Sequence, residues 1–94
     1  MVGKLFRRML GGGEAPASQV AARESYKGCE LEAVPVQDGG RWRVAGSVVK
    51  TIDGVEKRHD FVRADTFPDR DDAAAVSLSK GRLLVDQMGD KLFE

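Results

Sequence analysis

The chain has 94 residues, and its 15 Lys and Arg balance 15 Asp and Glu, so its formal net charge is zero. A balanced charge excludes a strong overall field that would draw the chain to nucleic acid or anionic lipid. The length suits one small domain, the single cysteine excludes an internal disulfide, and no apolar run reaches the roughly 18 residues of a membrane span, so we expect a cytoplasmic protein.

Residues 1–10 form a basic head whose apolar side chains recur at helical spacing, which predicts a short amphipathic helix. An isolated helix of this length is marginal in water and would need a partner to order it. Residues 11–24 are small and polar and are expected to form a flexible Gly/Ala/Pro linker. The apolar stripe of the head consists of Leu5, Phe6, Met9 and Leu10, and the basic residues beside it are Lys4, Arg7 and Arg8.

Two turn signals, Asp38-Gly39-Gly40 and Asp53-Gly54, divide residues 29–65 into three runs of strand-like composition. Asp-Gly between alternating apolar residues is a strong hairpin signal, because both central positions of a type I′ turn need a positive φ. A helical pattern follows these runs. Residues 25–94 therefore predict an α+β domain with a three-stranded antiparallel sheet and one C-terminal helix packed on one face (β-β-β-α), preceded by a flexible N-terminal tail.

The two turns also predict which strand residues lie opposite each other. Counting from a two-residue loop at Asp53-Gly54, and from a first turn at residues 37–40, gives registers that agree on one apolar face. This face should form the core against the helix. The expected pairs include Ile52 with Val55, Gly46 with Phe61, Val44 with Arg63 and Leu31 with Gly46; the face comprises Cys29, Leu31, Ala33, Trp42, Val44, Val48, Ile52, Val55 and Phe61.

The predicted helix has recognisable ends. Asp69 is the expected N-cap, and Asp71 and Asp72 place negative charge in the first turn, where the helix dipole favours it. Gly89 is expected to end the helix, and Leu92-Phe93 should then fold back onto the core. The face expected to meet the sheet comprises Ala73, Val76, Ser77, Lys80, Gly81, Leu84 and Met88.

The other face of the predicted sheet mixes charged and small apolar residues. Complementary cross-strand neighbours make a solvated face the plainer interpretation. The alternative is an interface for a protein partner or for self-association, because an apolar strip runs among arginines and interfaces favour arginine over lysine. The strip comprises Val34, Ala45, Val49 and Val62, and the remaining residues of the face are Glu30, Glu32, Arg41, Arg43, Ser47, Thr51, Glu56, Arg58 and Asp60.

No residue pattern in the chain predicts catalysis or metal binding. His59 is the only histidine and lacks a partner at any motif spacing, so a structural role is the plainer interpretation. Cys29 is predicted to face the core, where a thiol is inert. The aspartates between residues 65 and 72 miss the spacing of a calcium loop. We therefore expect a protein that is not an enzyme and carries no cofactor or metal.

Binding of DNA by the predicted sheet would use Arg41, Arg43 and Arg58 to contact phosphates. Carboxylates lie on the same face, whereas phosphate contacts normally require a clear positive patch, so this option is the weaker one. The head, with Arg7 and Arg8, is the segment whose charge suits DNA or weak contact with a membrane surface.

Five segments resemble the small bacterial HlyU-like family, which is commonly labelled a transcriptional activator. They are Leu5-Phe6-Arg7-Arg8, Tyr26-Lys27-Gly28, residues 39–46 (Gly-Gly-Arg-Trp-Arg-Val-Ala-Gly), residues 61–67 (Phe-Val-Arg-Ala-Asp-Thr-Phe) and residues 89–93 (Gly-Asp-Lys-Leu-Phe). The resemblance implies a role in transcription regulation and supplies no catalytic residues. The residues themselves predict neither a helix-turn-helix pair nor a basic recognition helix.

Two functions of different classes follow. The first is a non-enzymatic regulatory or adaptor module that binds a protein or nucleic acid through its open sheet face or its basic head. The second is a domain that binds a small molecule or peptide at the sheet end around Trp42 and Arg63, with His59 nearby.

Overall fold

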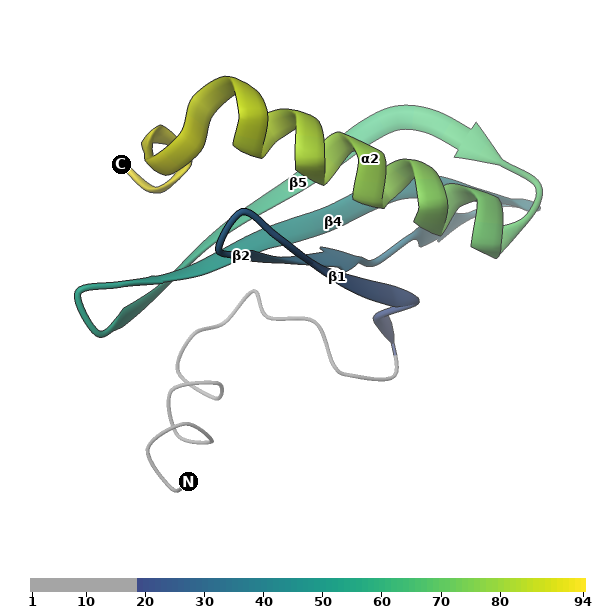
Figure 1. Ribbon diagram of the computed structural model, residues 1–94. Helices are drawn as coiled ribbons and strands as arrows, with labels where there is room; N and C mark the ends of the chain where they lie inside the picture. Colours follow the sequence, from purple (N-terminus) through teal and green to yellow (C-terminus); the bar gives the residue numbers. More distant parts are fainter. Residues whose placement is uncertain (1–18) are drawn as a thin grey trace.

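The computed structural model describes residues 19–94, which form a sheet covered on one face by a long helix (Figure 1). The predicted head and residues 11–18 of the predicted linker lie outside the described residues. The α+β class, the antiparallel sheet and the C-terminal helix are confirmed, whereas the number of strands is larger than predicted. The elements are β1 (Ala22–Tyr26), β2 (Cys29–Ala33), β3 (Val36–Asp38), β4 (Arg41–Ile52), β5 (Val55–Phe67), the helix α2 (Arg70–Met88) and the 3-10 turn η2 (Gly89–Phe93).

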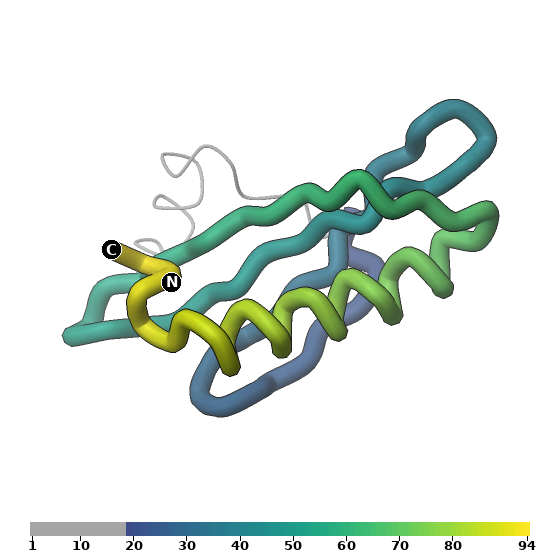
Figure 2. The backbone as a smooth tube through the Cα atoms, turned by 90° about the horizontal axis from the view of Figure 1, so that it is seen from above, coloured from purple at the N-terminus to yellow at the C-terminus, as the bar shows by residue number. Residues whose placement is uncertain are grey.

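The sheet is built around β4, and all its strand pairs are antiparallel. β5 pairs with one side of β4, while β2 and β3 pair with successive parts of the other side, and β1 pairs with the outer side of β2. Seen from above, β5 follows one side of β4, and β1 and β2 lie on the other (Figure 2). The prediction of three strands is therefore wrong, because residues 19–94 form five.

The first additional strand, β1, begins at Ala22, inside the segment expected to be linker. Its sequence, Ala-Arg-Glu-Ser-Tyr, contains no β-branched residue, so its composition carries little strand signal. A tight turn joins it to β2, with positive φ at Lys27 (51°) and Gly28 (81°), as a type I′ hairpin requires. The sequence did not predict this strand because a single glycine is a weak turn signal. What identifies the strand is its pairing with β2, which only the fold shows.

The second difference is a break that divides the predicted first strand into β2 and β3. Val34 donates its N–H to the carbonyl oxygen of Ala45 at 2.8 Å, but the next residue, Pro35, has no N–H to continue the ladder. Pairing resumes at β3, where Val36 lies opposite Arg43. One continuous predicted run thus becomes two short strands along the same side of β4.

The predicted register of the second hairpin is confirmed from its turn to the middle of the sheet. Ile52 lies opposite Val55, and Gly46 lies opposite Phe61. Beyond this point β5 carries an irregularity, because Ala45 lies opposite Val62 but Arg43 lies opposite Thr66. Residues 63–65 therefore lie against the single β4 residue Val44, and the expected pairing of Val44 with Arg63 is wrong.

The first hairpin turns more tightly than expected, which shifts its register. Asp38 lies opposite Arg41, so the loop is Gly39-Gly40 rather than residues 37–40. Leu31 consequently lies opposite Val48 instead of Gly46. Because the shift is two residues, every side chain stays on its expected face.

Both predicted ends of α2 are confirmed. The side chain of Asp69 accepts a hydrogen bond from the N–H of Asp71 at 2.8 Å, and Asp71 and Asp72 lie in the first turn. The helix ends at Met88, and Gly89 follows with a positive φ. Leu92 is buried beyond it, so the chain folds back onto the core as predicted.

The core lies between α2 and one face of the sheet. Leu31, Val44 and Val48 are fully buried there, and Gly81 allows close approach, because a Cβ at that position would lie 3.3 Å from Leu31. The expected faces need correction at their ends: Met88 (42% exposed) and Val55 (51% exposed) lie largely in solvent. The helix residues that are buried are Ala73, Ala74, Ser77, Gly81, Leu84 and Val85.

Candidate interaction surface on the open sheet face

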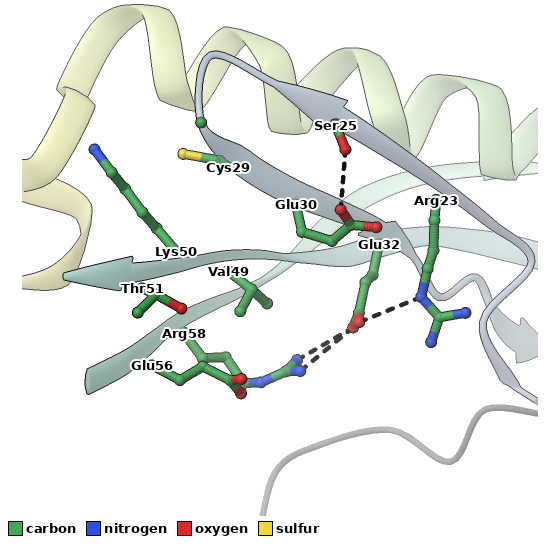
Figure 3. Close-up of a pocket in the computed structure, with 11 residues that line it drawn as sticks. Arg23, Ser25, Cys29, Glu30, Glu32, Val49, Lys50, Thr51, Glu56 and Arg58 are labelled. Carbon is green, nitrogen blue, oxygen red and sulfur yellow. Dashed lines mark hydrogen bonds and ion pairs between the residues drawn. The ribbon is translucent and has the colours of Figure 1, made fainter. Parts of the chain in front are cut away.

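The sheet face turned away from α2 is hollowed between β1 and β5. A polar hollow of about 640 Å³ is lined by side chains from β1, β2, β4 and β5 (Figure 3). Its lining is nearly balanced in charge, because it contains both arginine or lysine side chains and glutamate side chains. Its lining residues include Arg23, Cys29, Glu32, Lys50 and Arg58.

Glu32 is the centre of an ion-pair network in this hollow. The residue is only 9% exposed, and one carboxylate oxygen lies 3.4 Å from Arg58 Nη1 while the other lies 3.6 Å from Arg23 Nε. Figure 3 shows Glu32 between the two guanidinium groups. Arg58 also lies 3.5 Å from Asp60, whose carboxylate accepts a hydrogen bond from Ser47 Oγ at 2.6 Å. These contacts link β1, β2, β4 and β5.

The thiol of Cys29 borders the hollow but belongs to the core. Burial raises the pKa of this thiol above its ordinary value, and the positive charge of Lys50 opposes the shift only in part. The thiol is therefore protonated at neutral pH, whereas a nucleophilic cysteine must be a thiolate. Lys50 in turn binds Asp90 at 2.7 Å, which ties β4 to η2.

The arginines expected to meet phosphates are held by groups of the chain itself. Arg41 donates from Nε to Thr66 Oγ1 at 2.8 Å and from Nη2 to the Thr66 carbonyl at 3.0 Å. Arg43 pairs with Asp38 across the first hairpin and donates to the Arg63 carbonyl at 3.4 Å. Arg58 is bound to Glu32. Each of these three arginines therefore contacts a different group of its own chain, and they do not form one positive patch.

A smaller hollow of about 190 Å³ lies on the other half of the open face, where the predicted apolar strip is only partly exposed. Val62 is 65% exposed and Val36 is 47% exposed at its border. Ala45, which was expected to be open to a partner, is buried, and Asp60 provides a carboxylate beside the apolar residues. The open face thus has a polar, ion-paired half and an apolar half.

The second function predicted from the sequence requires Trp42, His59 and Arg63 to converge, and the structure separates them. Trp42 lines a hollow of about 490 Å³ with Val34, Pro35 and Arg70, whose guanidinium carbon lies 5.7 Å from the tryptophan ring centroid. His59 pairs with Val48, about 20 Å along β4 from Trp42 at ordinary strand rise. Arg63 is exposed at the β5 irregularity.

Arg70 was missed as a candidate because its contact with Trp42 is tertiary. It is the first residue of α2, directly after the N-cap, and no local pattern pairs it with a residue of β4. A cation over a tryptophan face is attracted by the ring quadrupole.

A second contact missed from the sequence joins β1 to the last turns of α2. The hydroxyl of Tyr26 donates to Asp86 at 2.9 Å, and Lys27 Nζ lies 2.7 Å from the same carboxylate. The hydrogen bond from Lys27, and then that from Tyr26, lowers the pKa of Asp86, and the same pairing raises the pKa of Lys27. Arg82 and Glu24 form a further contact at 2.6 Å. We call Tyr26, Lys27 and Asp86 the β1–α2 clamp.

Residues 19–94 contain no group of three or more His, Cys, Asp or Glu residues that could hold a metal ion. None of their helices is long and apolar enough to cross a membrane. Arg7 and Arg8 of the predicted head lie outside the described residues.

Comparison with known proteins places the chain in a family. No curated protein and no solved structure matches the chain. The family described as "Transcriptional activator HlyU" matches residues 4–93, a range that includes every strand and helix described above. The match also reaches into the predicted head, and it confirms the resemblance found in the five sequence segments. The chain therefore belongs to the HlyU family.

Proposed function

We propose that this chain is a non-enzymatic regulatory module of the cytoplasm, which takes part in transcription regulation by binding a protein segment on the apolar half of its open sheet face. The family description supports the link to transcription. The charge distribution of the folded part supports a protein partner over direct contact with DNA.

The observation that carries the proposal is the internal engagement of the sheet arginines. Arg41, Arg43 and Arg58 hydrogen-bond to a threonine, an aspartate and a glutamate of the chain itself. Phosphate binding would have to replace these contacts, and the carboxylates would remain to repel the phosphates. The start of α2 adds Asp71 and Asp72 rather than lysines.

The apolar half of the face indicates the chemistry of the partner. Val36 and Val62 border a hollow large enough for one apolar side chain, and the carboxylate of Asp60 lies at its border. An apolar residue would fill the hollow, and a lysine or arginine beside it would meet the carboxylate. We expect a protein segment that carries these two residue types side by side.

DNA binding by the full chain, measured by fluorescence anisotropy across a salt series, tests the first part of the proposal. Replacing Arg7 and Arg8 by alanine should abolish any salt-sensitive binding, whereas replacing Arg41 and Arg43 by alanine should leave it unchanged. Sequence-specific binding that survives the head substitutions and disappears with the sheet substitutions would show instead that the sheet contacts DNA.

A charge placed on the apolar half tests the second part. Val62→Glu should reduce the transcriptional response that depends on this protein in its host, because an ionised carboxylate would have to be desolvated by the partner. Val55→Glu is the matched control, since Val55 is similarly exposed but lies at the hairpin tip outside the hollow. Thermal unfolding should be alike for the two variants. Equal transcriptional responses would contradict the proposed face.

The hollow beside Trp42 favours a second candidate function, the binding of a small apolar anion or a peptide carboxylate. The tryptophan ring and Pro35 supply apolar surface, and the Arg70 guanidinium supplies positive charge. Trp42 is the only tryptophan in the chain, so its fluorescence reports on this hollow directly. Titration with aromatic carboxylates should shift the emission of the unmodified chain and not that of Arg70→Gln; no shift with any of them would remove this candidate.

A further inference from the structure

β5 is the longest strand of the sheet and lies at its edge. Among the described residues, β5 pairs with β4 on one side and with no strand on the other. An edge strand presents a row of backbone N–H and C=O groups that can pair with another chain. The irregularity at residues 63–65 limits the regular part of this edge to residues 55–62.

The backbone groups on this edge can be assigned from the ladder. Val34 donates to the carbonyl of Ala45, so the odd-numbered residues of β4 point their backbone groups toward β2 and the even-numbered ones toward β5. Gly46 pairs with Phe61, and Val48 pairs with His59, so the odd-numbered residues of β5 face β4. The N–H and C=O groups of the even-numbered residues 56–62 therefore point outward.

The side-chain charges of these even-numbered residues favour one register when the strand pairs with a second copy of itself. When the two-fold axis passes through His59, Arg58 lies opposite the partner's Asp60, and the symmetry repeats this pair. An axis through Arg58 would place Glu56 opposite the partner's Asp60, and an axis through Asp60 would place two aspartates together; both are repulsive. An axis through Lys57 would pair Arg58 with the partner's Glu56 but would shorten the pairing and bring two lysines together.

We infer that two copies of this chain associate through their β5 edges, antiparallel and with His59 on the two-fold axis, to form one continuous sheet. The inference goes beyond the proposed function, because edge pairing uses the backbone groups at the border of the sheet rather than the surface of its open face; Asp60 and Val62 border both regions. Arg58 keeps its contacts with Glu32 and Asp60 of its own chain, and its positive charge also lies on the strand opposite the partner's Asp60. The exposed carboxylate of Asp60 is thereby placed between two arginines.

The first experiment is sedimentation of the full chain over a range of concentrations. The average mass should rise with concentration from that of one chain toward that of two. Asp60→Arg would place arginines opposite each other and should weaken association at least tenfold. The matched control is Asp65→Arg, which makes the same charge change on β5 beyond the regular part of the edge. Circular dichroism should show that both variants remain folded.

The second experiment tests the register with introduced cysteines. In the proposed dimer the two copies of residue 59 face each other at about 4.5 Å between Cα atoms, which suits a disulfide, while the two copies of residue 57 lie too far apart. Under mild oxidation His59→Cys should therefore form covalent dimers much faster than Lys57→Cys, and the unmodified chain, with its buried Cys29, should form few. A chain that stays monomeric at all concentrations would overturn the inference, as would a dimer that Asp60→Arg does not weaken or whose cysteine variants cross-link equally.

Discussion

Gly46 determines how closely β2, β4 and β5 pack. A Cβ at this position would overlap the backbone oxygen of Glu32 and lie 2.9 Å from Phe61 Cζ. Since a strand backbone cannot move aside cheaply, Gly46→Ala should lower the free energy of unfolding by about 2–3 kcal/mol. Gly40→Ala is the matched control, because nothing lies within 4 Å of the added carbon and the φ of Gly40 is not positive. Similar values for the two variants in chemical denaturation would contradict this account.

Ser77 places a fully buried hydroxyl between helix and sheet. Its Oγ accepts a hydrogen bond from the N–H of Ala45 at 3.2 Å and donates to the Ala73 carbonyl at 2.7 Å. Ser77→Ala would leave the buried N–H of Ala45 unpaired, so we expect a loss of about 1–3 kcal/mol in unfolding free energy. The exposed Ser79→Ala should change it by less than about 0.5 kcal/mol. A loss for Ser77→Ala no larger than that for Ser79→Ala would show that the N–H finds another acceptor.

Arg58 shows where sequence analysis underestimates a surface residue. A charged residue on a solvated sheet face should cost less than about 0.5 kcal/mol when truncated. The structure instead leaves only 17% of the Arg58 side chain exposed, and its removal would leave Glu32 with Arg23 at 3.6 Å. Arg58→Ala should therefore cost about 1–3 kcal/mol in urea denaturation. Arg41→Ala, whose contacts with Thr66 are exposed, serves as the comparison, and an equal small cost for both would restore the solvated interpretation.

At the scale of the elements, the β1–α2 clamp joins the first described strand to the helix that follows the whole sheet. The two lie about 60 residues apart in the chain, so no local sequence pattern could predict their contact. β1 has little strand propensity of its own, so its position depends on its pairing with β2 and on this clamp. Both groups of the ion pair are exposed, which limits its contribution to global stability.

The pKa shifts predict how the clamp responds to acid. The pKa of Asp86 is lowered in the folded chain. The ionised carboxylate therefore stabilises the fold fully above about pH 4, the ordinary aspartate pKa. This stabilisation is lost as the pH falls through the lowered pKa. After correction for the intrinsic exchange rate, the protection of the β1 amides should therefore fall several-fold more than that of the β4 amides on acidification. In Asp86→Asn the protection of β1 should be lower already at neutral pH and change less with acid, whereas Asp65→Asn should match the unmodified chain. Identical pH profiles for β1 in all three would contradict the role of the clamp.

Elements with local signals could be predicted, and those with tertiary causes could not. Asp69 and Gly89 act on their own helix ends, and Asp53-Gly54 sets the register of the hairpin that encloses it, so all three were found from the sequence. β1 was missed because its signal is pairing rather than composition. The break at Pro35 was missed because a proline interrupts a strand only where its missing N–H would have paired with a neighbouring strand. The sequence does not show which strand that is.

For the molecule as a whole, the sequence shows which face is core and which is open, but not what the open face can still bind. The arginines of that face were visible, yet their engagement by Glu32, Asp38 and Thr66 depends on strands that lie side by side only in the fold. The hollow at Trp42 needs Arg70 from the start of the helix, which no spacing connects to it. The alternation of inward and outward residues is local to each strand, whereas the pairing of charges is a property of the assembled sheet.

The position of β1 has a mechanical consequence for any force applied to the chain before it. Along the backbone, such a force would be transmitted into the sheet through this strand. β1 would peel from β2 one hydrogen bond at a time, except that the clamp and the contact between Arg82 and Glu24 also anchor it to α2. Such a force would therefore be shared with the helix, because the clamp connects β1 to the last turns of α2.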